Sequence, residues 1–203
     1  MFDLAQRTLY APFRFSLMDA PIIAAIVAAS ATAIGWFVTN IASTISNRRN
    51  LRESVTLKYI ERQLEELYGP LNFLNLEGRQ TFSELLASLG RRHVFETGKS
   101  LSESDLKTWL FWVENDLFPR NEKIKALLAS KAHLYATKEV PASYLAFLDH
   151  HNSWYINHLR WKQEGIPYSW HSKVNWPPEF AKDVGRTFGE LKERYAKLLS
   201  KRE

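Results

Sequence analysis

Histidine and tryptophan are concentrated in one stretch of the sequence, Leu148–Trp161, which reads LDHHNSWYINHLRW. The stretch contains His150, His151 and His158, and Asp149 directly precedes the first of them. Imidazole and carboxylate groups are common zinc ligands and common general acids and bases. This stretch is therefore the first candidate for a metal site or a catalytic site.

The spacing of these residues on a helix argues against a single metal site. His151, Trp154, His158 and Trp161 recur at steps of three and four residues, so they share one helix face. Seven residues separate His151 from His158, about 10 Å along a helix axis, and one zinc ion cannot join them at Zn–N distances of about 2.0–2.1 Å. The four residues form either a packing face or an interaction face, and we assign no metal ligand among them.

The Asp-His-His triplet resembles the motif that names the DHH phosphoesterases. That family places the triplet beside a strand of an α/β fold and needs further aspartate clusters, and this sequence offers neither. An undetected metal-dependent hydrolase built on the histidine-rich helix stays the weakest alternative. We assign no catalytic residue and no cofactor.

Composition narrows the class of protein. The chain has 203 residues, no cysteine and a net charge of +5. The absence of cysteine excludes disulfides, thiol nucleophiles and thiolate zinc sites, and it fits a domain that faces the cytosol. Basic residues are spread along the chain rather than gathered in a stripe, which makes nucleic acid an unexpected partner.

A membrane helix is predicted near the N-terminus. Residues 20–47 include no charged residue and no histidine, and about 25 residues of helix cover the roughly 30 Å of a bilayer's hydrocarbon core. A buried core helix rarely runs this long without a charge, and a cleavable signal peptide fits poorly because 19 residues precede the segment. We therefore expect a tail at 1–19, a transmembrane helix at 20–47 and a helical domain at 48–203.

The basic residues beside this segment predict its orientation. Arg48, Arg49 and Arg52 follow it, whereas only Arg7 and Arg14 precede it. The positive-inside rule places residues 48–203 in the cytoplasm and the N-terminus outside a bacterial inner membrane. The three arginines would bind anionic lipid headgroups, and the aromatic tail would lie along the membrane or dock on a partner subunit.

Small residues follow one face of the predicted membrane helix at spacings of three, four and seven. Such stripes let helices approach closely in lipid. The alternative is that alanine is simply common in membrane helices. We expect self-association or a partner helix at Ala24, Ala28, Ala31, Gly35 and Ala42.

The remainder of the sequence predicts helices only. Apolar residues at steps of three and four run from Leu57 to Leu89 and pass through Gly69 and Pro70 in register, so we interpret this pair as a kink within one entry helix. Further helices are expected from Ser102 to a stop at Phe118-Pro119, from 121 to 135, from Pro141 to about Lys162, and from the paired prolines at 177–178 onwards. The fold class is all-α, a cytosolic bundle of five to six helices behind one transmembrane helix.

The helical part resembles a loose group of small bacterial single-pass membrane proteins that carry an ELYGPL-type motif. The similar segments are QLEELYGPL (63–71), NEKIKALLASKAHLY (121–135), PASYLAFLDHHNSWYINHLRW (141–161) and the PPEF helix. The resemblance implies an architecture and no activity; small anchored proteins of this design occur among bacterial anti-phage effectors. We expect a non-enzymatic, membrane-anchored interaction module, and one hypothesis is that it acts as such an effector; the alternative is an accessory subunit of a larger inner-membrane complex. Its partners would be the lipid bilayer and either a second copy or another protein.

Overall fold

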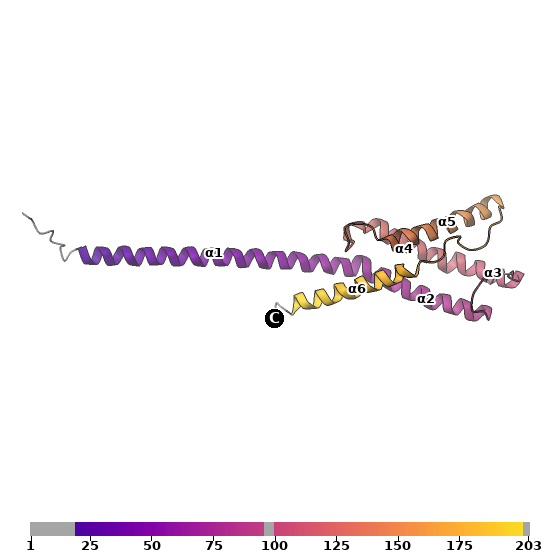
Figure 1. The fold of residues 1–203 in the computed structure, drawn as a ribbon, viewed down its shortest axis with the longest axis horizontal. Coiled ribbons are helices and arrows are strands. Elements are labelled where there is room, and N and C mark those ends of the chain that lie inside the picture. Colours follow the sequence, from indigo (N-terminus) through magenta and orange to yellow (C-terminus); the bar gives the residue numbers. More distant parts are fainter. Residues whose placement is uncertain (1–18, 96–99, 201–203) are drawn as a thin grey trace, which may run out of the picture. The chain divides into compact units, whose positions relative to one another are not determined.

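A computed structural model describes residues 19–95 and 100–200, and every regular element in these two ranges is helical (Figure 1). The predicted tail therefore lies outside the described residues, apart from Asp19 at the start of the first helix. The expected all-α class is confirmed for the described part of the chain. Its elements are α1 (Asp19–Gln63), η1 (Leu64–Tyr68), α2 (Gly69–Leu89), α3 (Glu103–Trp112), η2 (Val113–Leu117), α4 (Phe118–Ser130), η3 (Ala132–Leu134), α5 (Ala142–Glu164) and α6 (Pro178–Leu199).

The chain divides into two compact units at Arg52 and Glu53. In the first unit, α1 carries the charge-free segment, and its large apolar side chains are exposed, among them Ile26, Trp36 and Phe37. By length and composition this helix is able to cross a membrane. Gly35 has open space around it, since a Cβ added there would meet nothing within 4 Å.

Hydroxyl groups within this apolar segment are bonded to the helix itself. Thr32 donates to the carbonyl of Ala28 at 2.8 Å, and Thr39 donates to the carbonyl of Gly35 at 2.9 Å. Thr44 repeats the pattern on Asn40 at 2.8 Å. These bonds satisfy each hydroxyl proton without water, which is how threonine is accommodated in a nonpolar environment.

Two prolines of the second unit are accommodated by π-helical turns rather than by helix ends. The turn η1 precedes Gly69-Pro70, and the amide of Gly69 donates to the carbonyl of Leu64, five residues back. The turn η2 precedes Phe118-Pro119, and the amide of Phe118 donates to the carbonyl of Val113 in the same way. A proline inside a helix has no N–H and its ring collides with the carbonyl four residues earlier, and a widened turn removes that collision.

The expected helix stop at Phe118-Pro119 was wrong, because the chain passes from α3 through η2 into α4 without leaving helical geometry. At Gly69-Pro70 the expected continuation through the proline is confirmed. The position predicted to kink is directly preceded by η1, and π-helical turns are a usual site of helix bending.

Ser102 caps α3 as the sequence predicts. Its hydroxyl accepts a hydrogen bond of 3.1 Å from the amide of Asp105, the third residue of that helix. This cap satisfies one of the free amides at the helix start. The cap marks the start of α3.

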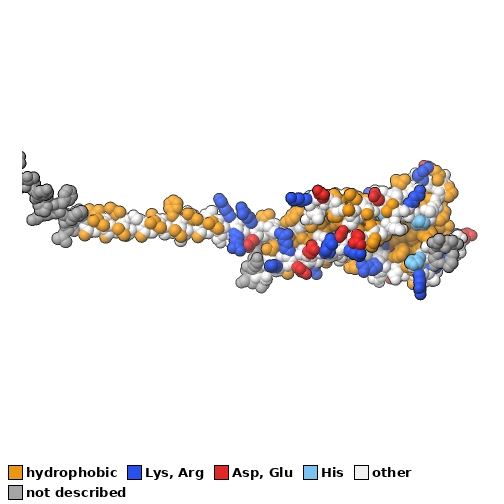
Figure 2. Space-filling view, in the orientation of Figure 1, with side chains coloured by type: hydrophobic (Ala, Val, Ile, Leu, Met, Phe, Trp, Pro, Cys, Tyr) orange, Lys and Arg blue, Asp and Glu red, His pale blue; other side chains and the backbone are white. Residues whose placement is uncertain are grey.

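The second unit is built on two apolar clusters. The first gathers residues of η1, α2, α4, α5 and α6 around Tyr68, Phe147 and Phe180. The second gathers Leu85, Val94, Trp109, Val113, Phe118 and Trp154. The apolar register predicted for the entry helix is confirmed at Ile60, Leu67 and Leu71, all of which are buried. In Figure 2, hydrophobic side chains line a hollow in the second unit, with histidine at its edge.

Candidate functional site

The histidine-rich stretch forms the middle of α5, and its side chains are engaged inside the second unit. His151, Trp154 and His158 are 0%, 5% and 3% exposed, while Trp161 is partly exposed. Phe118 of α4 packs against this face, with ring centroids 4.6 Å from Trp154 and 5.0 Å from His158. The face is therefore covered by residues of the same chain.

Each buried histidine has its own polar partner. Nε2 of His151 donates to Oε1 of Glu122 at 2.6 Å, which leaves its Nδ1 buried and without a partner among the described residues. Nε2 of His158 donates to Oε1 of Glu114 at 3.1 Å, and Nδ1 accepts from the hydroxyl of Tyr168 at 2.7 Å. Nδ1 of His150 donates to the carbonyl of Val174 at 2.6 Å. The hydrogens are placed from these partners, because a carboxylate and a carbonyl only accept.

Burial lowers the pKa of all three histidines below its ordinary value, although Glu122, Glu114 and the Val174 carbonyl each oppose the shift. Burial would raise the pKa of Glu114, but hydrogen bonds from Lys162 and His158 outweigh it and lower that pKa. The histidines are therefore held as neutral groups bonded to separate partners. Within residues 19–95 and 100–200, no three histidine, aspartate or glutamate side chains come close enough to hold a metal ion.

Carboxylates of the second unit are bonded across elements. Asp116 of η2 contacts Arg120 and accepts from Thr81 of α2 at 3.1 Å. Asp105 forms an ion pair of 2.8 Å with Arg91. Thr81 and Arg91 lie 35 and 14 residues from these acids along the chain, so the helical spacing of the acids gave no signal of these two contacts.

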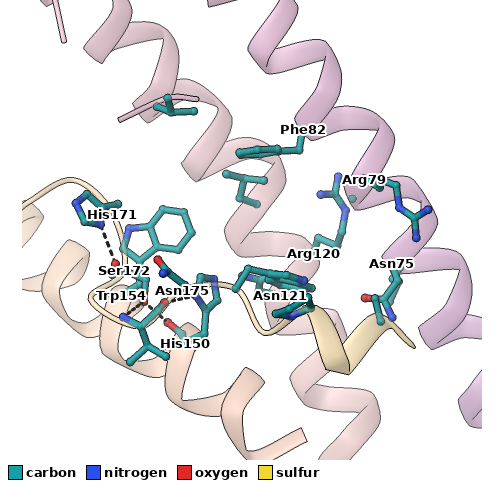
Figure 3. A pocket seen from close by; sticks show the side chains of 18 of the residues that line it. Asn75, Arg79, Phe82, Arg120, Asn121, His150, Trp154, His171, Ser172 and Asn175 are labelled. Atoms are coloured by element: carbon teal, nitrogen blue, oxygen red, sulfur yellow. Dashed lines mark hydrogen bonds between the residues drawn. The ribbon is translucent and has the colours of Figure 1, made fainter. Parts of the chain in front are cut away.

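A cavity of about 840 Å³ opens beside the histidine face. Its walls come from α2, α3, α4, α5, the start of α6 and the 13 residues between α5 and α6 (Figure 3). Trp109 and Trp154 stack in its wall, with ring centroids 5.7 Å apart and planes 12° apart. Trp176 adds a third indole. This size and aromatic lining are typical of a small-molecule site.

The segment 165–177 is tied to the rest of the cavity by hydrogen bonds. The carbonyl of Trp170 accepts from Nε1 of Trp109 at 2.6 Å, and Ser172 donates to the carbonyl of His150 at 2.9 Å. Trp170 has a φ of 64°, a left-handed conformation that a bulky residue rarely adopts. Backbone strain of this kind persists only where surrounding contacts hold it, and it concentrates at binding and active sites.

Amide side chains supply the buried polar groups of the cavity. Asn75 of α2 is 8% exposed, and neither its Nδ2 nor its Oδ1 has a hydrogen-bond partner among the described residues. Asn121 of α4 is 5% exposed and lines the same cavity. An unsatisfied buried amide is costly, and among the described residues only Asn75 has two buried side-chain atoms without a partner.

The charged residues lining the cavity are all basic among those that the structure describes. Arg120 is buried and is neutralised by Asp116 and Glu77. Arg79 is exposed on α2, and Lys182 of α6 also lines the cavity and pairs with Glu179. The cavity therefore combines aromatic walls, a free amide and a basic edge.

Sequence reasoning identified α5 but missed this cavity. The sequence predicts no helix between about Lys162 and the paired prolines at 177–178, and it singled out neither this segment nor Asn75 as part of a site. One signal was present: Leu71, Asn75, Gly78 and Phe82 follow each other at steps of four, three and four, which places an asparagine in a core-facing register.

The other predicted residues lie in the first unit. Ala24, Ala28, Ala31, Gly35 and Ala42 are exposed on α1, and so are Arg48, Arg49 and Arg52. The contacts expected of them, with lipid and with a second helix, involve molecules outside this chain.

Comparisons with protein-family models, with curated proteins and with solved structures found no match to this chain.

Proposed function

We propose that the protein is a membrane-anchored, non-enzymatic helical module that acts by binding, with one membrane helix and a cytoplasmic helical domain. The observation that carries this proposal is the exposure of the charge-free segment: Ile22, Val27 and Ile34 are each more than half exposed. Water would oppose so much exposed apolar surface, whereas lipid favours it.

The hydroxyl bonds of Thr32, Thr39 and Thr44 support the same environment, since their protons are satisfied within the helix. Arg48, Arg49 and Arg52 follow the segment and would anchor it at the cytoplasmic headgroups. The second unit then faces the cytoplasm, where its cysteine-free composition fits a reducing compartment.

The small residues on α1 are proposed to mediate association with a second membrane helix. Gly35 lies in open space, and its lack of a side chain lets another helix approach closely. A leucine at this position would separate the two backbones without changing the apolar character of the segment.

The proposal is tested by membrane extraction and crosslinking at native expression level. We expect the protein to resist alkaline carbonate, and C-terminal reporter fusions to be active in the cytoplasm only. Gly35→Leu should reduce crosslinked oligomers several-fold, whereas Ala33→Leu, on another face of α1, should leave them unchanged. Release by carbonate would overturn the membrane anchor. Equal crosslinking of both variants would overturn association through the small-residue face.

A further inference from the structure

The cavity of the second unit carries an inference that goes beyond membrane anchoring and partner binding. We propose that it is a binding site for one nucleotide, with the base packed on the indole rings and bonded to Asn75 and the phosphate at the basic edge. All of its lining residues belong to the unit Glu53–Glu203. The proposal is therefore independent of the membrane anchor.

The walls suit a flat aromatic ring. Trp109, Trp154 and Trp176 come from α3, α5 and the segment 165–177, and Phe95 packs edge-on against Trp109 with centroids 5.3 Å apart. Stacking on tryptophan is a general means of holding a nucleobase, because every base presents a π-face. The cavity volume of about 840 Å³ exceeds what water alone requires and lies in the range of cofactor sites.

Asn75 provides hydrogen-bonding groups for the polar edge of a base, which stacking on indole rings does not supply. Its amide offers two N–H donors and a carbonyl acceptor, and both ends are buried without a partner. A base edge presents a donor beside an acceptor, and asparagine pairs with such an edge in a bidentate manner. An acyl chain would fill the same aromatic space but would leave the amide unsatisfied, so the observations favour a nucleobase over a fatty acid.

His150 adds a second polar contact at the opposite wall. Its Nδ1–H is committed to the Val174 carbonyl at 2.6 Å, so Nε2 is the unprotonated nitrogen of a side chain that lines the cavity. Figure 3 shows His150 and Trp154 on one side of the cavity and Asn75 on the other. A base lying between them meets an acceptor on one side and an amide on the other.

The phosphate is assigned to the basic edge. Arg79 follows Asn75 by one helical turn on α2, about 6 Å along the axis, and it is exposed. No acidic residue appears among the described residues that line the cavity, whereas Arg79, Arg120 and Lys182 do. In a nucleotide, a sugar separates the base from the phosphate. In the same way, one helical turn separates the buried amide of Asn75 from the exposed guanidinium of Arg79.

The test uses the full chain in detergent micelles and measures binding by calorimetry and thermal unfolding. AMP, GMP, CMP and UMP are titrated separately, and adenosine, inorganic phosphate and octanoate serve as partial ligands. We expect one or more nucleotides to bind with a stoichiometry of one and to raise the unfolding temperature. Inorganic phosphate and octanoate should do neither.

Asn75→Leu should weaken nucleotide binding at least tenfold while the unliganded protein unfolds at the same or a higher temperature, because an unsatisfied amide is replaced by an apolar group of similar size. Asn152→Leu, an exposed position on α5, is the matched control and should change neither quantity. Arg79→Gln should weaken nucleotides several-fold and leave adenosine unaffected, and its exposed position keeps this test valid if Asn75→Leu fails to fold.

Three outcomes would overturn the proposal: no nucleotide binds at millimolar concentration, both variants bind as the parent does, or octanoate binds and Asn75→Leu strengthens it. The last result would identify an acyl ligand. A negative result here leaves membrane extraction and crosslinking unaffected, so failure of the nucleotide site and failure of the anchor are distinguishable.

Discussion

The two π-helical turns η1 and η2 each precede a proline and are closed by the same kind of backbone hydrogen bond, but the residue that donates this bond has no side chain in one turn and a large side chain in the other. Gly69 follows η1 and Phe118 follows η2, and each amide donates to the carbonyl five residues back. A Cβ on Gly69 would lie 2.5 Å from the carbonyl oxygen of Leu64. Phe118 carries a Cβ at φ −68° and ψ −47°, whereas Gly69 has a ψ of −56°. One turn is closed by close backbone approach and the other by a packed ring.

The polar groups of the two turns differ as well. Glu66 in η1 pairs with Arg62 and Lys131, which lower its pKa to about 2. Glu114 in η2 pairs with His158 and Lys162. The carboxylate of the first turn is therefore paired with an arginine and a lysine, whereas that of the second is paired with a histidine and a lysine.

Phe118→Ala gives the second turn a small residue like that of the first. It is expected to lower stability the most, because it removes a buried ring. Phe118 is 5% exposed and packs against Trp154, Tyr155 and His158. Its removal should lower the free energy of unfolding by about 3–5 kcal/mol. Urea titration of the detergent-solubilised chain, followed by circular dichroism, measures the change.

Phe111→Ala is the control for this substitution, since Phe111 is 65% exposed on α3. Its effect should stay within about 0.5 kcal/mol. A loss below about 1 kcal/mol for Phe118→Ala, well under the usual cost of removing a buried ring, would show that η2 is held by its backbone, as η1 is.

Gly69→Ala makes the first turn resemble the second and should have an intermediate effect. The added Cβ must displace the Leu64 carbonyl, and backbone strain of this kind costs about 1–3 kcal/mol. Gly189→Ala in α6 is the matched control, since its Cβ would meet nothing within 4 Å. That control should stabilise the protein by about 0.4–1 kcal/mol. Equal stability changes for the two alanines would contradict a close approach at η1.

The fold was predictable from the sequence wherever a pattern lies within one element. The charge-free segment and the apolar register from Leu57 to Leu89 are of this kind, because helix periodicity depends on neighbours only a few residues apart. The outcome at Phe118-Pro119 was not predictable by the same means. Proline usually ends a helix. Here helical geometry continues through Pro119, and Phe118 packs on α5, a contact that lies outside the local sequence pattern.

The site was predictable only in part, for a related reason. Helical spacing predicts that His151 and His158 do not share one ion, and this stays a prediction. It gave no indication that their partners are Glu122 and Glu114, which are 29 and 44 residues away along the chain. The described lining of the cavity comes from six helical elements and two connecting segments, so no window of sequence contains it.

The smallest expected effect is the pH dependence of the second turn. The lowered pKa of His158 means that the unfolded chain, with an ordinary pKa of about 6.5, binds more protons below that pH. Stability is therefore complete above about pH 6.5 and falls as the pH drops below it. Glu114, Lys162 and the Tyr168 hydroxyl face this histidine, and His150 and His151 contribute with the same sign.

Urea midpoints at pH 7.5 and pH 5.5 test this expectation. The midpoint should be lower at pH 5.5, and His158→Gln should reduce the difference. Glu66→Gln should leave the difference unchanged, because the pKa of Glu66 is about 2 and its contribution is lost only at much lower pH. An unchanged midpoint between the two pH values would contradict the expectation, because it would show that protonation of the buried histidines does not lower the stability of the folded chain.

The π-helical turns also constrain how this sequence can change in length. Each contains one residue more than an α-helical ladder needs, and deleting that residue would restore regular hydrogen bonding locally. The deletion would also rotate every later residue of the helix by about 100° around the axis. Leu71 and Asn75 after η1, and Ile124 and Leu128 after η2, would then leave the interior that they occupy now. Exposed positions within these turns are free to vary in side chain, but the number of residues in each turn is fixed.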